Sequence, residues 1–216
     1  MKPTFRNWAW AAMAAGTLAL GAAATAKAND WYQWRGPEQD GVSRETNLPD
    51  KWSPDGENVV WTNDVGGMSS PIVMNGRIYT LSRVGEVNTG DATVPGPHAQ
   101  ETFVCVDFKT GNKIWEHREN MTQTDDPFWR IGWSNPAGDP ETGNVYALGA
   151  QCTFLCLDGN DGHVIWSHQM TEEFGLISTF GGRTPSPSID EDQVIIAGVA
   201  FGWGDNARDD HLIFVD

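Results

Sequence analysis

Short apolar runs separated by Gly, Asp and Pro recur along the chain, and their spacing predicts β-strands rather than helices. Residues 104–115 carry an Asp-x-x-x-Gly stretch followed by Ile-Trp, and residues 155–166 repeat this order 51 positions later. Cys, Asp, Gly, Ile and Trp coincide in register between the two segments. No segment has a sustained helical period, so we predict an all-β chain built from repeats of about 50 residues.

Each repeat is predicted to hold four strands. The first strand begins after Pro71, Pro136 or Pro187, where a missing N–H is tolerated. The second is a Gly-x-Ile/Val-Tyr run or its equivalent, and the third is the apolar run that ends in Asp. A tight Asp-x-x-x-Gly turn leads to the fourth strand, whose Trp we expect to pack between neighbouring units. The predicted structural residues are Asp107, Gly111, Trp115, Asp158, Gly162 and Trp166.

Four-stranded repeats of this length are typical of the blades of a β-propeller. We predict a lead-in segment at residues 29–58 and a partial propeller at 59–216, with blade 1 at about 59–120, blade 2 at about 133–170 and blade 3 at about 183–216. Blade 3 reaches the Asp of its repeat at Asp216. Because an uncovered blade would expose an apolar face, we expect this chain to be a fragment that packs against the remaining blades of the same protein.

The repeated Asp-x-x-x-Gly-x-x-Ile-Trp pattern resembles the repeat of pyrroloquinoline-quinone (PQQ)-like β-propellers. That group includes quinoprotein alcohol dehydrogenases and BamB-like outer-membrane assembly proteins. Residues 31–37 (Trp-Tyr-Gln-Trp-Arg-Gly-Pro), with Asp-Gly at 40–41 and Trp-Ser at 52–53, resemble the start of secreted members from planctomycete-type bacteria. The resemblance covers residues 31–216 and implies a ring of about seven or eight blades. It therefore implies that this chain is an incomplete N-terminal portion with about three of them.

The first 28 residues have the layout of a secretory signal peptide. Lys2 and Arg6 precede an apolar stretch over residues 8–26, and Ala-Lys-Ala at 26–28 is a small-x-small cleavage pattern. We predict cleavage before Asn29, no transmembrane helix in the mature chain, and a periplasmic or extracellular location in a bacterium. A retained membrane anchor is the alternative, because the stretch is just long enough to span a bilayer.

The chain is strongly acidic, with a net charge of −15. Loss of residues 1–28 would remove three cations and leave 11 Lys and Arg against 29 Asp and Glu, a net charge of −18. Such a chain does not attract a polyanion through its net charge, so we predict no nucleic-acid partner. Cys105, Cys152 and Cys156 indicate no disulfide framework, and we expect them to be small buried residues.

The connections that exceed what strand closure needs fall on one face of the predicted disc. They lie within residues 84–100, around 202–210, and in the links between blades at 119–132 and 170–182. Enlarged loops are where function is usually found, so we expect binding at this face. The candidate binding residues lie near the starts of the first strands: Met68, Trp129, Arg130, Trp133, Arg183 and Thr184. Arg130 and Arg183 could form an anion-binding rim, or they could serve ordinary packing and loop salt bridges.

The sequence contains no motif of an enzyme site: it has no Cys-Cys step, Ser-His-Asp motif, phosphate loop or Cys-x-x-Cys. Residues 158–162 look like a Ca²⁺ loop but lack its Asp spacing and terminal Glu, so we interpret them as a β-turn and predict no metal site. The acidic stretches at 125–126 and 205–210 are the alternative place for a cation. We therefore predict an exported, non-catalytic propeller that binds a protein, peptide or glycan through its loop-rich face, with no evident cofactor.

Two other functions stay open through the resemblance. The full protein could be a PQQ- and Ca²⁺-dependent alcohol or sugar dehydrogenase whose catalytic residues lie in further blades. It could also have a BamB-like role in outer-membrane assembly. The absence of a Cys near the cleavage point argues against that role, because such proteins are anchored by a lipid on that residue.

Overall fold

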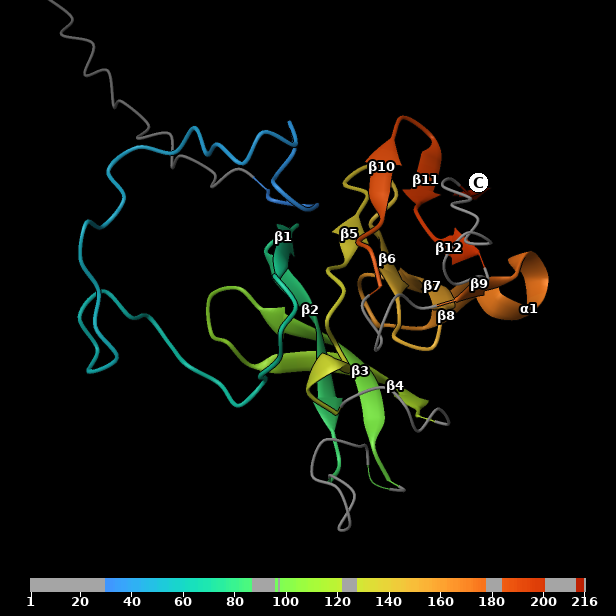
Figure 1. Cartoon of the computed structure of the whole chain (residues 1–216). Coiled ribbons are helices and arrows are strands. Elements are labelled where there is room, and N and C mark those ends of the chain that lie inside the picture. The colour runs from blue at the N-terminus through green and yellow to red at the C-terminus, as the bar shows by residue number, and fades with distance from the viewer. Residues whose placement is uncertain are drawn as a thin grey trace, which may run out of the picture.

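The two complete repeats fold as four-stranded antiparallel sheets that fan out side by side (Figure 1). A computed structural model describes residues 30–86, 96, 98–121, 128–177, 184–200 and 213–215. The predicted signal peptide at residues 1–28 lies outside these residues. In each complete sheet the strands follow one another in chain order, which is the topology of a propeller blade.

Blades 1 and 2 share one strand order and one register. The strands of blade 1 are β1 (Ile72–Met74), β2 (Arg77–Val84), β3 (Gln100–Asp107) and β4 (Lys113–Asn120). Those of blade 2 are β5 (Ala137–Gly138), β6 (Asn144–Leu148), β7 (Thr153–Asp158) and β8 (Val164–Gln169). A tyrosine, a cysteine and a tryptophan stand in one row across each sheet: Tyr79, Cys105 and Trp115, then Tyr146, Cys156 and Trp166. The prediction of an all-β, propeller-type chain is confirmed.

The third repeat contributes a three-stranded sheet to the described part of the chain. Its strands are β10 (Ser188–Asp190), β11 (Gln193–Ile196) and β13 (Ile213–Val215). A separate two-stranded ladder joins β9 (Leu176–Ile177) to β12 (Val199–Ala200). Within the described residues, helical structure is limited to the 3₁₀ turn η1 (Phe128–Arg130) and to α1 (Met170–Phe174), in the links between blades. Neither is long and apolar enough to cross a membrane.

The hydrophobic core lies between adjacent sheets rather than inside any one blade. Leu81 and Phe103 of blade 1 share a cluster with three residues of blade 2: Ala147, Leu155 and Leu157. A second buried cluster joins blade 2 to the third sheet and includes Leu148, Phe154, Cys156, Val194 and Ile196. Because each blade buries its faces only against its neighbours, the blades stabilise one another in sequence order.

The tryptophan of blade 1 docks on the β7–β8 turn of blade 2. Trp115 Nε1–H donates to the carbonyl of Gly159 at 3.1 Å. The indole covers Gly162, where a Cβ would lie within 3.0 Å of ring atoms Cγ, Cδ2 and Cε3. Gly162 also has a φ of 77°. Any side chain at this position would therefore meet both a clash with the indole and backbone strain, which explains why the repeat has glycine here.

The N-terminal segment of the described chain crosses the inner strands of all three sheets. Trp31 exchanges two backbone hydrogen bonds with Val73 of β1, at 2.8 and 2.9 Å. The carbonyl of Tyr32 accepts from an N–H of β5 at 2.6 Å. The side chain of Gln33 accepts from an N–H of β10 at 3.3 Å. Three consecutive residues thus tie the three sheets together at their inner edges.

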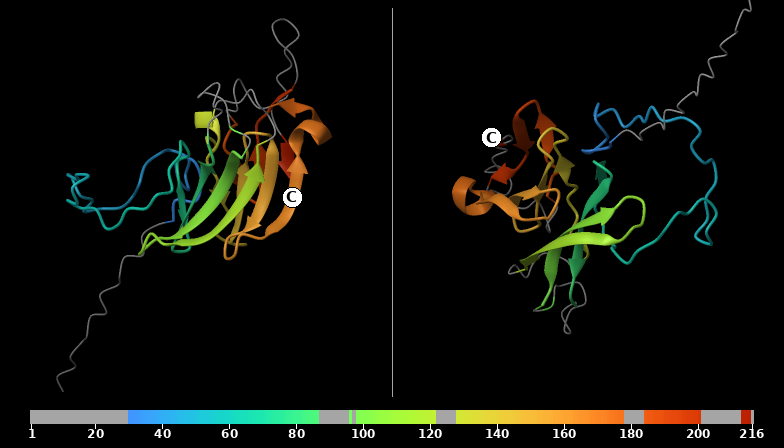
Figure 2. Two further views of the ribbon diagram at one scale, coloured as in Figure 1. Left: turned by 90° about the horizontal axis from the view of Figure 1, so that it is seen from below. Right: turned by 180° about the vertical axis from the view of Figure 1, so that it is seen from behind.

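The two ends of the strands form opposite faces of the blades, which we call the turn face and the loop face. The turn face holds the short β3–β4 and β7–β8 turns (Figure 2, left). The loop face, at the other end of the strands, holds η1, α1 and the β6–β7 turn. The inner strands β1, β5 and β10 all begin at the loop face, because each runs toward a turn on the opposite edge.

Candidate binding site on the loop face

A row of hydrogen bonds runs from blade to blade where the inner strands begin. Ser70, Asn135 and Ser186 directly precede the prolines at the starts of β1, β5 and β10. The Ser70 N–H donates to Asn135 Oδ1 at 2.5 Å. The Asn135 N–H and its side-chain amide both donate to Ser186 Oγ, at 3.3 and 2.9 Å. Each step satisfies a donor of one blade with a side chain of the next, so the row fixes the spacing of the blades at this face.

Two glycines let the chain pack against the end of β2 just before this row. A Cβ on Gly132, whose φ is 70°, would lie 2.7–2.9 Å from backbone atoms of Ser82. A Cβ on Gly67 would lie 2.9 Å from a backbone oxygen of β2. The candidate residues Met68 and Trp133 directly follow these glycines. The position of their backbone is therefore set by the close packing at the two glycines.

Two of the predicted binding residues present accessible apolar surface at this face. Met68 is 54% exposed and Trp129 is 39% exposed, whereas Arg130 and Trp133 are half-buried. A cation lies beside Trp129: the Arg83 guanidinium is 5.1 Å from the centroid of the Phe128 ring and donates to the Trp129 carbonyl at 3.3 Å. The joint between blades 1 and 2 thus combines an exposed indole with a guanidinium held in place by stacking and a hydrogen bond.

The other two predicted binding residues are Thr184, which is buried, and Arg183. Thr184 is only 6% exposed, and its hydroxyl donates to the carbonyl of Leu148 at 3.1 Å. It therefore joins the third sheet to blade 2 and offers little surface to a ligand. Arg183 lies outside the described residues, so the anion-binding rim that would pair it with Arg130 stays a prediction.

A buried carboxylate beneath this surface was not singled out from the sequence. Glu101 of β3 is 2% exposed, and its two oxygens accept the N–H groups of Gly132 and Ala150, both at 2.8 Å. Gly132 belongs to the link between blades and Ala150 to the β6–β7 turn, so one side chain ties three segments together. The sequence did carry a signal, because Glu101 is an acidic residue in register with the buried Phe103 and Cys105 of an apolar strand.

A family model described as "Outer membrane protein assembly factor BamB" matches residues 50–208 of the chain. The chain belongs to this family of PQQ-like repeat proteins. The match confirms the resemblance inferred from the Asp-x-x-x-Gly and Trp pattern. It covers both complete blades and the row of hydrogen bonds on the loop face. The narrower likeness to planctomycete-type members stays a prediction.

Three solved structures are similar to part of the chain at low sequence identity. A europium-containing methanol dehydrogenase is 14% identical with a TM-score of 0.44, over 70% of this chain and 23% of its own length. The quinohemoprotein alcohol dehydrogenase ADHIIG from Pseudomonas putida HK5 is 19% identical with a TM-score of 0.37, over 64% and 18%. BamB from Moraxella catarrhalis is 16% identical with a TM-score of 0.33, over 66% and 51%. The chain therefore spans about half or less of these BamB and dehydrogenase chains. No curated protein matches the chain.

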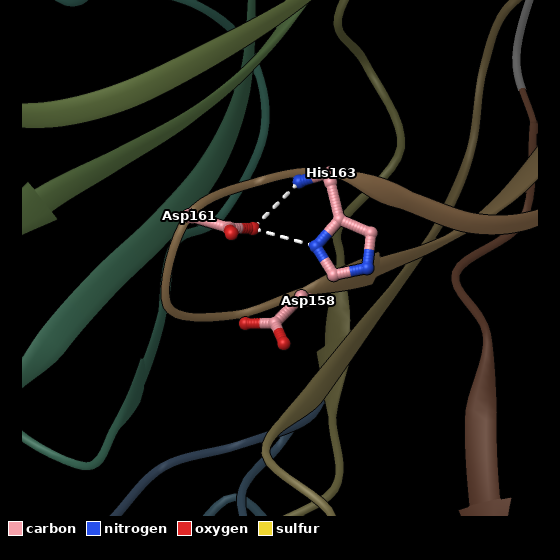
Figure 3. A group of neighbouring side chains, drawn as sticks. All are labelled: Asp158, Asp161 and His163. Atoms are coloured by element: carbon pink, nitrogen blue, oxygen red, sulfur yellow. Dashed lines mark hydrogen bonds and ion pairs between the residues drawn. The ribbon is translucent and has the colours of Figure 1, made fainter.

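Among the described residues of this BamB-family chain, one group has the composition of a metal site, and it lies on the turn face. Asp158, Asp161 and His163 bring one ligand atom each within 4.8 Å of one another (Figure 3). Asp161 Oδ1 accepts the His163 N–H at 3.0 Å and lies 2.7 Å from its Nδ1. These hydrogen bonds lower the pKa of Asp161, and the side-chain bond to Asp161 raises the pKa of His163. They account for the shape of the turn, so we assign no ion to it.

The turn of blade 1 supports the same interpretation. Asp107 Oδ1 accepts the N–H groups of Lys109 and Thr110 at 3.0 and 2.8 Å, and the Thr110 hydroxyl at 2.9 Å. The hydrogen bonds from Thr110 lower the pKa of Asp107. One carboxylate is enough to close this turn, which has the same Asp-x-x-x-Gly sequence as the turn of blade 2.

Among the described residues, the side chains with metal-ligand chemistry have structural roles. Each oxygen of Glu101 accepts a backbone N–H group, and Asp158, Asp161 and His163 lie on the opposite face. Burial raises the pKa of the Cys105 thiol to about 12 and that of Cys156 to about 11. Thiols with such pKa values are poor nucleophiles and metal ligands. Both cysteines stand opposite a blade tryptophan, which indicates a packing role.

Proposed function

We propose that this chain is part of an exported, non-catalytic propeller that binds a segment of another protein across its loop face. The observation that supports this most is the exposed indole of Trp129 beside a preorganised backbone. Glu101 holds the link three residues further on, at Gly132, and η1 holds Trp129 itself. Large aromatic side chains on a rigid support bind at low entropic cost, which makes them frequent anchors of protein interfaces.

The chemistry beside Trp129 favours a peptide with apolar and acidic side chains. Met68 offers a flexible apolar contact, and the Arg83 guanidinium is positioned to attract a carboxylate. The name of the family, an assembly factor for outer membrane proteins, also supports a protein partner. A glycan could stack on the same indole, and it is the alternative ligand that the test below separates.

Export is part of the proposal and rests on residues 1–28. Their basic start, apolar stretch and Ala-Lys-Ala ending support secretion by a cleaved signal peptide. Expression of the whole coding sequence in a bacterium, followed by sequencing of the periplasmic product, should give an N-terminus at Asn29. A product that stays in the membrane with Met1 intact would contradict this part of the proposal.

The binding site can be tested by panning a displayed dodecapeptide library against the protein. We expect enriched peptides that combine aromatic or aliphatic residues with Asp or Glu. The double variant Met68→Ala/Trp129→Ala should bind them at least roughly tenfold more weakly, the effect of losing about 1.4 kcal/mol. Trp52→Ala is the matched control, because Trp52 is 72% exposed but lies in the lead-in segment. Equal loss in the control, or enrichment only from a glycan array, would rule out the proposed peptide site.

The rival function, a quinoprotein oxidoreductase, calls for a separate measurement. Addition of PQQ with Ca²⁺ to the full protein should leave its melting temperature unchanged and give no alcohol-dependent dye reduction. A thermal shift together with dye reduction would contradict the non-catalytic proposal and support a dehydrogenase.

A further inference from the structure

A cavity lies at the inner end of the turn face, between the lead-in segment and the β5–β6 turn. The lead-in segment reaches this place where it crosses the inner strands, and it is drawn in blue near β1 and β5 (Figure 1). The volume of the cavity is about 400 Å³, and its apolar wall includes Trp31, Tyr32, Pro37 and Pro140. Small-molecule sites in proteins have volumes of roughly 300–1,000 Å³ and largely apolar walls. The cavity therefore has the size and the lining of a ligand site.

The aromatic part of the wall is attached to blades 1 and 2. Trp31 is bonded to β1 through its backbone, and its indole packs on Gly36. A Cβ on Gly36 would lie 2.8–2.9 Å from three atoms of the six-membered ring. The carbonyl of Tyr32 accepts from β5, and the Tyr32 side chain packs against the buried cluster that joins the two blades. Both aromatic side chains are half-buried. Because they are held in place before a ligand arrives, little entropy is lost when one binds.

The loop on one side of the cavity has a fixed and strained shape. Arg35 and Gln39 lie in the left-handed region, with φ of 64° and 56°, although neither is glycine. The carbonyl of Arg35 accepts the N–H of Gly41 at 2.9 Å, and its guanidinium donates to the carbonyl of Asp40 at 2.9 Å. Strain of this kind is concentrated at functional sites, where it holds the groups that meet a ligand. Here the strained residues flank residues 37–38, which line the cavity.

Three charged side chains of both signs line the cavity. Glu38 and Arg44 form an ion pair, in which Arg44 Nη2 lies 2.5 and 2.6 Å from the two oxygens of Glu38. Asp30 Oδ2 accepts the N–H of Asn75 at 3.1 Å, and within the described part of the chain Oδ1 accepts no hydrogen bond. The lining thus offers carboxylate acceptors and guanidinium donors with a net charge of only −1. A hydroxyl both donates and accepts, so a neutral ligand with several hydroxyls can use both kinds of group.

We propose that this turn-face cavity binds a sugar ring of a neutral saccharide. The apolar C–H face of the sugar packs against Trp31 and Tyr32, and its hydroxyls bond to Asp30 and to the pair of Glu38 and Arg44. A free anion is the less suitable ligand, because two carboxylates face one guanidinium. A small organic cation is the other alternative, since an ammonium group can also lie on an aromatic ring.

A glycan array probed with the full-length mature protein tests the proposal. We expect neutral glycans to be retained, and titration calorimetry with the best of them should give one site per chain. Choline and inorganic phosphate serve as the charged probes and should not compete with that glycan. Retention of no neutral glycan would overturn the proposal. Competition by choline would show a cation site and would also overturn it, and competition by phosphate would do the same for an anion site.

Variants of the exposed rim locate the site without disturbing the fold. The side chains of Glu38 and Arg44 are 52% and 73% exposed, so Glu38→Ala/Arg44→Ala should leave the melting temperature unchanged. It should weaken glycan binding at least roughly tenfold, the effect of losing hydrogen bonds to charged groups. Trp34→Ala is the matched control, because Trp34 is 50% exposed in the same loop but does not line the cavity. Equal affinities of wild type and the double variant, or an equal loss in Trp34→Ala, would contradict the proposed site.

Two further variants complete the test. Trp31→Ala should weaken glycan binding more than the rim variant does, because it removes the aromatic wall. If it fails to fold, the rim variant still decides the outcome. Met68→Ala/Trp129→Ala should bind the glycan as tightly as wild type, because these residues lie on the loop face. The cavity and the proposed peptide site can therefore fail independently, and glycan binding lost in the loop-face variant would place the saccharide there and overturn this inference.

Discussion

Blades 1 and 2 are closely alike on the turn face and differ on the loop face. On the turn face both have an Asp that closes its own turn and a left-handed Gly covered by a tryptophan of the preceding segment. On the loop face, Glu101 stands where blade 2 has Cys152, because Phe103 and Phe154 two positions later both pair with a histidine. The β6–β7 connection is a four-residue turn, whereas β2 and β3 are separated by residues 85–99.

This difference follows from what each face must do. On the turn face, the β3–β4 and β7–β8 turns are each the docking surface for a tryptophan of the preceding segment, so their residues are constrained by two partners at once. Among the described residues of the loop face, the contact that repeats from blade to blade is the row of hydrogen bonds at the inner strands. Residues there can change from one blade to the next, and this freedom is what a binding surface requires.

The largest effect is expected from breaking the turn-face joint at Gly162. Gly162→Ala places a methyl group against the Trp115 indole and forces a left-handed conformation on alanine. We expect the free energy of unfolding to fall by about 2–5 kcal/mol, the sum of strain and overpacking. Chemical denaturation measured by tryptophan fluorescence gives this value.

Gly143→Ala is the matched control for that experiment. Gly143 closes the β5–β6 turn with a φ of 80°, but a Cβ there would meet nothing within 4 Å. Only the strain remains, about 1–2 kcal/mol. The difference between the two variants measures the indole contact alone. Equal losses would mean that the docked tryptophan does not constrain the glycine.

A smaller effect is expected from the carboxylate that distinguishes blade 1 on the loop face. Glu101→Gln replaces one acceptor by an amide N–H₂, which then faces the N–H of Gly132 or of Ala150. Leaving one buried donor unsatisfied should cost about 1–3 kcal/mol. Hydrogen exchange should become faster at Gly132 and Ala150 but not at the β7–β8 turn.

Cys152→Ala changes the corresponding position of blade 2. It tests whether the effect at Gly132 comes from loss of the Glu101 carboxylate or from any change at this position of a blade. Cys152 is 4% exposed, so its truncation also disturbs a buried site. It should leave exchange at Gly132 unchanged, because that N–H is held by blade 1. If both variants accelerate exchange at Gly132, Glu101 is not the specific support of the link.

The sequence predicted the turn-face features well and the loop-face features in part. The Asp, Gly and Trp of each repeat coincide at fixed spacing because every blade needs them for the same contact. A third turn of the same kind was missed: residues 139–144 read Asp-x-x-Thr-Gly-Asn, as do residues 107–112, and Asp139 accepts from Glu141 and Thr142. It joins β5 to β6 rather than third to fourth strands, so a search in repeat register does not reveal it.

Other features depend on contacts between distant segments. The crossing of residues 31–33 over three inner strands has no local pattern, since it uses backbone carbonyls and one glutamine side chain. Met68 and Trp129 are exposed, whereas Thr184 is buried against Leu148. The spacing of residues before each first strand places them near one face. It does not determine which side chains point to solvent, because that depends on the neighbouring blade.

The smallest expected effect is a pH dependence that distinguishes the β7–β8 turn of blade 2 from the β3–β4 turn of blade 1. The hydrogen bond to Asp161 raises the pKa of His163. The folded state therefore binds the second proton of the imidazole ring more tightly than the unfolded state does. The bond therefore stabilises the turn fully below the ordinary histidine pKa of about 6.5, and this contribution is lost as pH rises through the higher folded value. Asp161→Asn should return the pKa of His163 toward its ordinary value, as measured by NMR titration of the ring. In blade 1 the corresponding residues are Thr110 and Asn112. Asn112→His should therefore titrate with a lower pKa than His163, and equal pKa values in the two turns would exclude Asp161 as the cause.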